Sequence, residues 1–192
     1  MIRKVIAVLI FIILFGCQGD EQTSLTVDMY NAAGDMVGTA KFGEQPEGVS
    51  IKVKVEGLTP GLHGIHVHEF PECEGPDFKS AGNHFNPEGK EHGLMNPKGP
   101  HLGDLPNVEA DASGVVDVEL MLASATMLEG KSSIFKNGGK SLIIHSEQDD
   151  GVSQPSGESG ERLICGEIKL ESKEDSKESP TDPTENNEKK KK

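Results

Sequence analysis

The sequence centres on Gly61–Asp104, which reads GLHGIHVHEFPECEGPDFKSAGNHFNPEGKEHGLMNPKGPHLGD. This stretch holds six of the seven histidines of the 192-residue chain: His63, His66, His68, His84, His92 and His101. Neutral imidazole is the commonest protein ligand for borderline transition metals. We therefore interpret the stretch as metal-binding, against the alternative of a polar loop with scattered surface histidines.

One pair of histidines lies on a predicted strand. Residues His63–His68 form a short alternating run, and strand geometry would place His66 and His68 on the same face. Two imidazoles on one face of a rigid strand form half of a metal site. His63 shares this parity with neither, so we interpret it as a structural hydrogen-bonding residue.

A second group lies in a segment with no helical or strand period. The segment is rich in Gly, Pro and Asn, which favour turns, and it has few apolar residues whose burial could order it. A bound ion would supply that order, because the free energy of ligation becomes free energy of folding. Three nitrogens and one carboxylate oxygen suit tetrahedral zinc. The sequence thus predicts a zinc site formed by His84, His92, His101 and Asp104.

Several short motifs resemble those of the copper/zinc superoxide dismutase family. They occur in collinear order within about residues 24–170: G-I-H-V-H-E-F at Gly64–Phe70, A-G-N-H-F-N-P at Ala81–Pro87, H-x8-H-x2-D at His92–Asp104, G-D-L-x-N at Gly103–Asn107 and R-L-x-C-G at Arg162–Gly166. The resemblance implies an enzyme that uses a copper ion and a zinc ion. Its substrate would be the superoxide anion, which is dismutated to dioxygen and hydrogen peroxide.

The resemblance also implies a ligand set. Copper would be held by His66, His68, His84 and His145, and zinc by His84, His92, His101 and Asp104. His84 would then bridge the two metals through its two ring nitrogens. Asp149 would link a copper histidine to a zinc histidine, fixing ring orientation and raising ligand basicity.

Further roles follow only from the resemblance. Arg162 would attract superoxide to the copper site, and His84 would deliver a proton to the product. Cys73 and Cys165 would form an intramolecular disulfide. The segment between Asp149 and Arg162 has no lysine and carries Glu158 and Glu161. Any electrostatic attraction of the substrate is therefore expected to be weaker or to come from elsewhere.

Two other functions remain open at this point. One is an extracellular protein that binds copper or zinc without redox turnover, to which loss of a copper ligand would point. The other is an unrelated zinc hydrolase that uses the His66–His68 pair. A hydrolase needs an open zinc position and a general base nearby, and a fully ligated three-histidine, one-aspartate site argues against it.

The remaining sequence predicts an all-β fold. Candidate strands alternate apolar and polar residues and are rich in Val, Ile and Thr: Ser24–Tyr30, Met36–Phe42, Val49–Glu56, His63–His68, Val115–Met121, Ser141–His145 and Arg162–Leu170. We expect a Greek-key β-sandwich or barrel of about eight antiparallel strands with long metal-binding loops. The chain has no Trp and one Tyr, so Phe42, Phe70 and Phe85 are expected in the core.

The two ends of the chain differ from the predicted domain, residues 24–170. Residues 1–16 combine basic Arg3 and Lys4 with a short apolar run, which is typical of a signal peptide. Cys17 follows in a sequence that resembles a bacterial lipobox, so we expect lipidation there and a polar tether over residues 17–23. Residues 171–192 contain no large apolar side chain and are predicted to be a disordered charged tail.

Charge and cysteine content bear on location and partners. The formal net charge is −13, and cleavage after residue 16 would remove two cations, so nucleic acid is excluded as a partner. Three cysteines leave an odd one in an exported protein, and lipid on Cys17 would account for it. We expect a protein anchored to the membrane at Cys17 that faces the extracytoplasmic side. The sequence does not indicate an oligomeric state.

Overall fold

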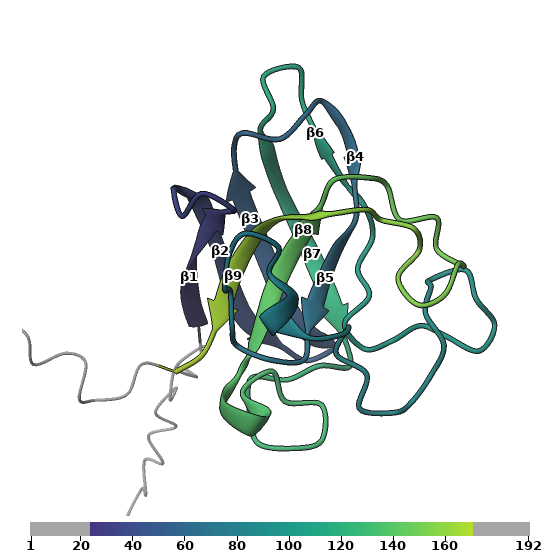
Figure 1. Cartoon of the computed structure of the whole chain (residues 1–192). Helices are drawn as coiled ribbons and strands as arrows, with labels where there is room; N and C mark the ends of the chain where they lie inside the picture. Colours follow the sequence, from purple (N-terminus) through teal and green to yellow (C-terminus); the bar gives the residue numbers. More distant parts are fainter. Residues whose placement is uncertain (1–23, 171–192) are drawn as a thin grey trace, which may run out of the picture.

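The computed structural model describes residues 24–170 (Figure 1). The predicted signal peptide (1–16), the tether (17–23) with Cys17, and the charged tail (171–192) lie outside the described residues. The described part contains nine strands and two single-turn 3-10 helices: β1 (Ser24–Asn31), β2 (Met36–Gln45), β3 (Gly48–Val55), β4 (Gly61–His63), β5 (Ile65–His68), η1 (Lys79–Ala81), β6 (Val108–Ala110), β7 (Val116–Ala123), η2 (Lys136–Gly138), β8 (Lys140–His145) and β9 (Arg162–Ile168).

Seven of the strands form one sheet in the order β5-β8-β9-β1-β2-β3-β7, and every neighbouring pair is antiparallel. Strands β4 and β6 form a small second sheet. The all-β prediction is therefore confirmed, although β6 was not predicted and the described residues hold nine strands. None of the helices in residues 24–170 has the length and apolar character needed to cross a membrane.

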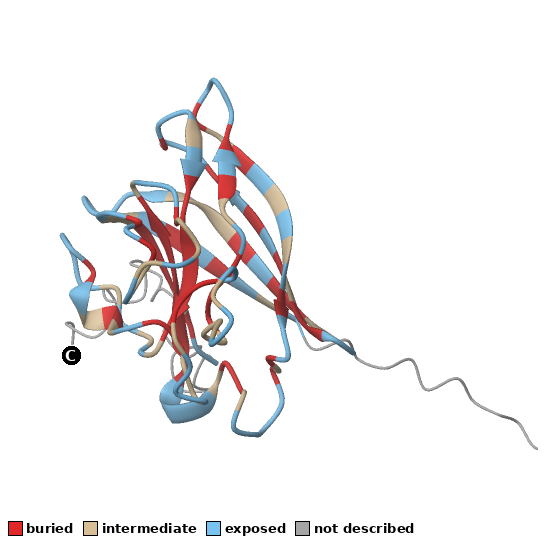
Figure 2. Ribbon diagram, turned by 90° about the vertical axis from the view of Figure 1, so that its right-hand side faces the viewer, coloured by how far each residue is buried: buried red, intermediate tan, exposed pale blue. Residues whose placement is uncertain are grey.

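Buried and exposed side chains alternate along the strands, and the buried ones form the core. On β3, Val49, Ile51 and Val53 are buried, whereas Lys52 and Lys54 between and after them are exposed. Buried aliphatic side chains from all seven strands of the large sheet form one cluster, and in Figure 2 buried and exposed segments alternate along strands of the curled sheet. Burial of each Val or Ile side chain contributes roughly 1.5–3 kcal/mol, so the core does not require Trp.

The predicted single strand His63–His68 is wrong in detail, because the chain breaks at Gly64. Strand β4 pairs with β6, whereas β5 pairs with β8. A Cβ at Gly64 would lie 2.9 Å from the Cβ of Ser159, so the close approach of the chain here requires glycine. The Gly64 carbonyl accepts the His145 N–H at 2.8 Å. This break allows the His66–His68 pair to join the strand that carries His145.

Two of the three predicted core phenylalanines are buried. Phe42 is 0% exposed and Phe85 is 5% exposed, whereas Phe70 is 43% exposed. The prediction for Phe70 is wrong because β5 ends at His68, which leaves Phe70 beyond the sheet. There it lines a surface pocket instead.

The predicted disulfide Cys73–Cys165 is present, with a Cα–Cα distance of 5.7 Å. It ties the segment between β5 and His84 to β9. Phe78, Ala81 and Ile143 pack around Cys165 in a small separate cluster. The bridge and this cluster together hold a segment that has no strand of its own.

Candidate metal centre

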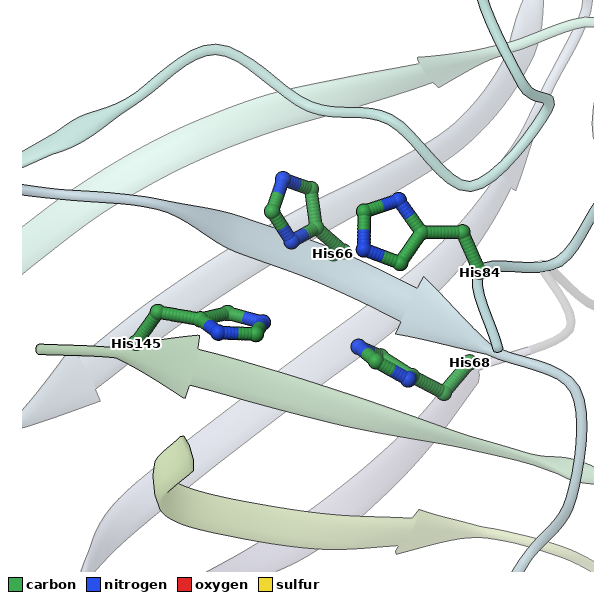
Figure 3. Close-up of side chains that lie close together, drawn as sticks. All are labelled: His66, His68, His84 and His145. Carbon is green, nitrogen blue, oxygen red and sulfur yellow. The ribbon is translucent and has the colours of Figure 1, made fainter. Parts of the chain in front are cut away.

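Neighbouring strands and one loop bring four histidines together (Figure 3). His66 and His68 project from β5, and His145 ends β8, the strand that pairs with β5. His84 follows the η1 turn and reaches the group through an isolated bridge with His68. Figure 3 shows the four rings pointing toward a common space.

This first group is compact and buried. The ring centroid of His66 lies 4.0 Å from that of His84 and 4.8 Å from that of His145, and the rings of His68 and His84 are 4.9 Å apart. Each residue offers one nitrogen, and these four nitrogens all lie within 4.8 Å of one another. All four side chains are at least 95% buried. The arrangement suits one metal ion with imidazole ligands.

A second group shares His84 with the first. It adds His92, His101 and Asp104, whose ligand atoms also lie within 4.8 Å of one another. The Asp104 carboxylate lies 2.8 Å from Nδ1 of His84, 3.1 Å from Nδ1 of His92 and 3.4 Å from Nδ1 of His101. It also accepts the main-chain N–H groups of Gly93 and His101. The structure thus brings together all four residues of the predicted zinc site.

Ring nitrogens without hydrogen-bond partners mark the two sites. Buried polar atoms normally have a partner, but seven buried histidine nitrogens within residues 24–170 have none: His66 Nδ1, His68 Nε2, His84 Nε2, His92 Nδ1, His101 Nδ1, and both nitrogens of His145. These atoms belong to the two groups described above. Lone pairs of neutral imidazoles that converge in this way fit metal ions.

Neighbouring groups select the tautomers that leave these lone pairs free. Nδ1–H of His68 donates to the Gly82 carbonyl at 3.0 Å, and Nε2–H of His66 donates to Asp149 at 2.7 Å. In each ring the other nitrogen is left as a ligand atom. The outer partners thus fix both the orientation and the protonation of the rings.

Burial keeps three of the imidazoles neutral. It lowers the pKa of His84 to about 4 and that of His145 to about 2, and the other imidazoles nearby add to both effects. Asp104 opposes the shift at His84 without cancelling it. The pKa of His68 is also lowered well below its usual value by burial. At neutral pH these rings therefore keep lone pairs available for a cation.

His92 behaves differently because carboxylates flank both of its ring nitrogens. Burial lowers its pKa, but the nearby carboxylates of Asp104 and Asp149 outweigh this effect and raise the pKa to about 9. The same contacts, against an opposing effect of burial, hold the pKa of both carboxyl groups below its ordinary value. The site therefore holds two carboxylates that favour a cation at this position.

Asp149 lies between the two groups. Its Oδ2 is 2.7 Å from Nε2 of His66, and its Oδ1 is 3.1 Å from Nε2 of His92. It is 7% exposed. One carboxylate thus touches a histidine of each group, as the family resemblance implied.

Asn107, the last residue of the G-D-L-x-N motif, holds Asp149 in place. Its amide Nδ2 donates to the Asp149 carbonyl, and its Oδ1 accepts the Asp149 N–H, both at 2.8 Å. The side chain therefore holds the main chain of Asp149 from both sides. Its place four residues after Gly103 gave a motif match, but only the fold shows what it binds.

Arg162 lies at the rim of a pocket beside the first histidine group. The pocket has a volume of about 820 Å³ and is lined by His68, His84 and His145 as well as Arg162. The Arg162 guanidinium donates to the carbonyls of Phe78 and Gly82, each at 2.7 Å. The cation is therefore held in place in the lining of this pocket. Lys131 and Lys136 line the same pocket, which the sequence did not indicate.

Comparisons with known proteins agree on one family. The family model described as copper/zinc superoxide dismutase (SODC) matches residues 36–168. A protein of Aquifex aeolicus named superoxide dismutase [Cu-Zn] 2 is 42% identical over 160 residues, covering 82% of this chain and 94% of that relative. A superoxide dismutase-like protein of Bacillus subtilis is 42% identical over 145 residues, 74% of each chain.

Solved structures give the same result. The crystal structure of a double mutant of a SOD-like protein from Bacillus subtilis has a TM-score of 0.74 and 42% identity, covering 76% of this chain and 97% of that chain. The Cu/Zn superoxide dismutase from Brucella abortus has a TM-score of 0.65 and 34% identity, covering 77% of this chain and all of that chain. On its sequence, its fold and its two histidine groups, the chain belongs to the copper/zinc superoxide dismutase family.

Proposed function

We propose that this protein is an enzyme that dismutates superoxide to dioxygen and hydrogen peroxide with bound copper and zinc. The family match and the relatives named Cu-Zn superoxide dismutase support this function. Copper would be held by His66, His68, His84 and His145, and zinc by His84, His92, His101 and Asp104. Two superoxide anions and two protons are consumed for each dioxygen and hydrogen peroxide released.

The observation that carries the proposal is the position of His84. Its Nδ1 faces Asp104 at 2.8 Å, whereas its Nε2 is buried without a hydrogen-bond partner. His84 is also the one residue that belongs to both four-residue groups found within residues 24–170. A ring placed in this way can serve two cations, one at each nitrogen, which suits a copper site joined to a zinc site.

The side chains around His84 have different roles in the reaction. When bound, copper supplies one-electron redox chemistry, whereas zinc has none and organises its loop. Nε2 of His84 is the atom that we assign to proton delivery, because it faces the pocket-lining histidines. Arg162 attracts the superoxide anion into the pocket. Asp149 keeps the rings of His66 and His92 in the orientation that metal binding requires.

A metal analysis combined with an activity assay tests this function. We expect the purified protein to bind one copper and one zinc per chain and to consume superoxide. His145→Ala removes a residue of the first group only, so this variant should keep zinc and lose activity. A fully loaded wild-type protein without dismutase activity would instead support a redox-inactive metal-binding protein. A zinc-only protein with esterase or peptidase activity would support a hydrolase.

We further propose that the protein is exported and anchored by lipid at Cys17. The apolar run before Cys17 supports export, and so does the Cys73–Cys165 disulfide, because such bonds persist in oxidising compartments. Incorporation of labelled palmitate tests the anchor in a host that lipidates exported proteins. Wild-type protein should be labelled and membrane-bound, whereas Cys17→Ala should be unlabelled. Equal labelling of both would contradict the assignment.

A further inference from the structure

The loop between β8 and β9 holds the main chain of His92 through one side chain. The Gln154 Nε2 donates to the His92 carbonyl at 2.9 Å, and the His92 N–H donates to the Gln154 Oε1, also at 2.9 Å. A single amide thus satisfies both main-chain polar groups of a residue that we assign as a zinc ligand. The Gln154 Nε2 also donates to the Val152 carbonyl at 3.0 Å.

One other side chain, that of Asn96, is hydrogen-bonded to the main chain of His92. Within residues 24–170, no main-chain group is hydrogen-bonded to its N–H or its carbonyl. The one other partner of the carbonyl is the Asn96 side chain, at 3.0 Å. Since His92 lies outside every strand and helix, its orientation depends on side chains, and Gln154 provides two of the three bonds.

The same loop packs directly on the chain around His92. The Met95 N–H donates to the Gly151 carbonyl at 3.1 Å. A Cβ added at Gly93 would lie 2.0 Å from that carbonyl oxygen, and one added at Gly157 would lie 2.8 Å from Nε2 of His92. Glycine at position 93 therefore lets the two main chains meet, and glycine at position 157 leaves room for the side chains of Asp149 and His92. The hydrogen bonds of Gln154 are thus part of a packed contact between the β8–β9 loop and the segment around His92.

The Gln154 contact matches the one made by Asn107. Asn107 holds the N–H and carbonyl of Asp149 just as Gln154 holds those of His92. Asp149 and His92 are themselves in contact, with Oδ1 3.1 Å from Nε2. The two amides therefore fix both ends of the contact that orients the His92 ring.

We propose that Gln154 is a positioning residue for zinc, which holds His92 so that its Nδ1 faces Asp104. This inference rests on the proposed zinc site. It also gives the short lysine-free loop a role, because Pro155 and Ser156, which follow Gln154, line the pocket beside the first histidine group. One loop thus forms a wall of the substrate pocket and aims a zinc ligand.

The test is zinc affinity, measured by competition with a chromophoric chelator on the full chain. Gln154→Leu removes both bonds to His92, and Gln154→Glu keeps an acceptor for the His92 N–H but cannot donate to the carbonyl. We expect both variants to bind zinc roughly tenfold more weakly, as is typical when a group that orients a metal ligand is lost. Copper affinity should stay near the wild-type value. Gln148→Leu is the matched control, because Gln148 is exposed in the same loop.

Two further readouts separate positioning from a merely structural role. Cobalt(II) placed in the zinc site should give an altered absorption spectrum in Gln154→Leu and the wild-type spectrum in Gln148→Leu. Melting temperatures of the metal-free proteins should change little, because the contact matters through the metal. Wild-type zinc affinity and cobalt spectrum in both Gln154 variants would overturn the inference, as would an equal loss of zinc and copper affinity.

Failure of this inference can be distinguished from failure of the proposed function. A wild-type protein that binds zinc but does not dismutate superoxide refutes the function and leaves the Gln154 result to be judged on zinc affinity. An active wild-type enzyme whose Gln154 variants bind zinc normally refutes the inference alone. A wild-type chain that binds no zinc refutes both.

Discussion

The chemistry proposed here depends on how single imidazoles are oriented and kept neutral. His84 has a carboxylate at one ring nitrogen and an unpartnered buried nitrogen at the other. His66 and His92 each give one N–H to the same carboxylate, that of Asp149. In His66, His68 and His84 the ligand nitrogen is left free because the other ring nitrogen is hydrogen-bonded.

Replacement of Asp149 by Asn tests this view. The amide keeps the size of the side chain but cannot accept from both rings, so one of them loses its orientation. We expect zinc affinity to fall by roughly 10–100-fold, measured by competition with a chelator. Asp117→Asn, on an exposed part of β7, should leave the affinity unchanged. Wild-type zinc binding in Asp149→Asn would contradict the role given to this carboxylate.

Strands and loops contribute in different ways to the site. Strands β5 and β8 place His66, His68 and His145 through ordinary antiparallel pairing, whereas the remaining ligands come from segments without regular structure. The disulfide holds one of these segments, and the carbonyls of Phe78 and Gly82 within it bind Arg162. The bridge therefore serves both stability and the position of the guanidinium.

Removal of the disulfide should affect both properties. We expect the Cys73→Ser, Cys165→Ser double variant to lose about 2–5 kcal/mol of unfolding free energy, since the bridge closes a loop between cysteines 92 residues apart. Urea unfolding measures this. The catalytic efficiency should also fall, because the acceptors of Arg162 become mobile. A variant with wild-type stability and activity would show that the packing of Phe78 alone holds the segment.

Metal removal should loosen the loop that carries His92 and His101. This loop has few apolar contacts of its own, so ligation supplies much of its order. We expect hydrogen exchange in residues 86–103 to increase in metal-free protein, whereas β2 and β3 remain protected. Uniform exchange increases over the whole domain would contradict a local role for the metals.

Sequence patterns anticipated much of this arrangement but not the loop packing. Alternation along strands and the clustered histidines required only local information. The break at Gly64 was missed because it depends on contact with Ser159, far along the chain. The exposure of Phe70 follows from where β5 ends, and the Gln154 contact follows from how two irregular loops meet. Neither the end of β5 nor the contact between the loops produces a periodic pattern in the sequence.

At the scale of the whole molecule, an acidic protein must attract an anion. The net charge is −13, but the substrate pocket is lined by four cations, Lys131, Lys136, Lys140 and Arg162, and by one carboxylate, Glu69. Among the described residues, those that line the pocket include neither Glu158 nor Glu161. The sequence left open whether the attraction is weaker or comes from elsewhere. Lys131, Lys136 and Lys140, before and at the start of β8, are a source of positive charge elsewhere in the chain.

Lys140 holds the lysine-lined side of the pocket in place. It is 2% exposed, and its Nζ donates to the carbonyls of Lys136 and Gly139 at 2.7 and 2.8 Å. It also lies 4.9 Å from the ring centroid of Phe85. This buried lysine therefore fixes the main chain at Lys136, whose exposed ammonium group can act on the approaching anion.

Salt dependence of turnover tests whether these lysines steer the substrate. We expect the catalytic efficiency to fall as ionic strength rises, because screening weakens attraction. Replacing Lys131 and Lys136 by Gln should lower the efficiency at low salt by roughly tenfold and flatten the salt dependence. Replacing Lys41 and Lys52, which are exposed on β2 and β3, by Gln is the control for the loss of two charges. Equal effects of both replacements would show that the pocket lysines have no special role.

The most direct test of the account is a crystal structure of the protein loaded with copper and zinc, with anomalous diffraction at both metal edges. We predict two ions on opposite sides of the His84 ring, copper at Nε2 with the other three histidines of its group and zinc at Nδ1 with its own group. Two distant ions, or an His84 ring that touches only one of them, would contradict the shared imidazole on which the proposed chemistry depends.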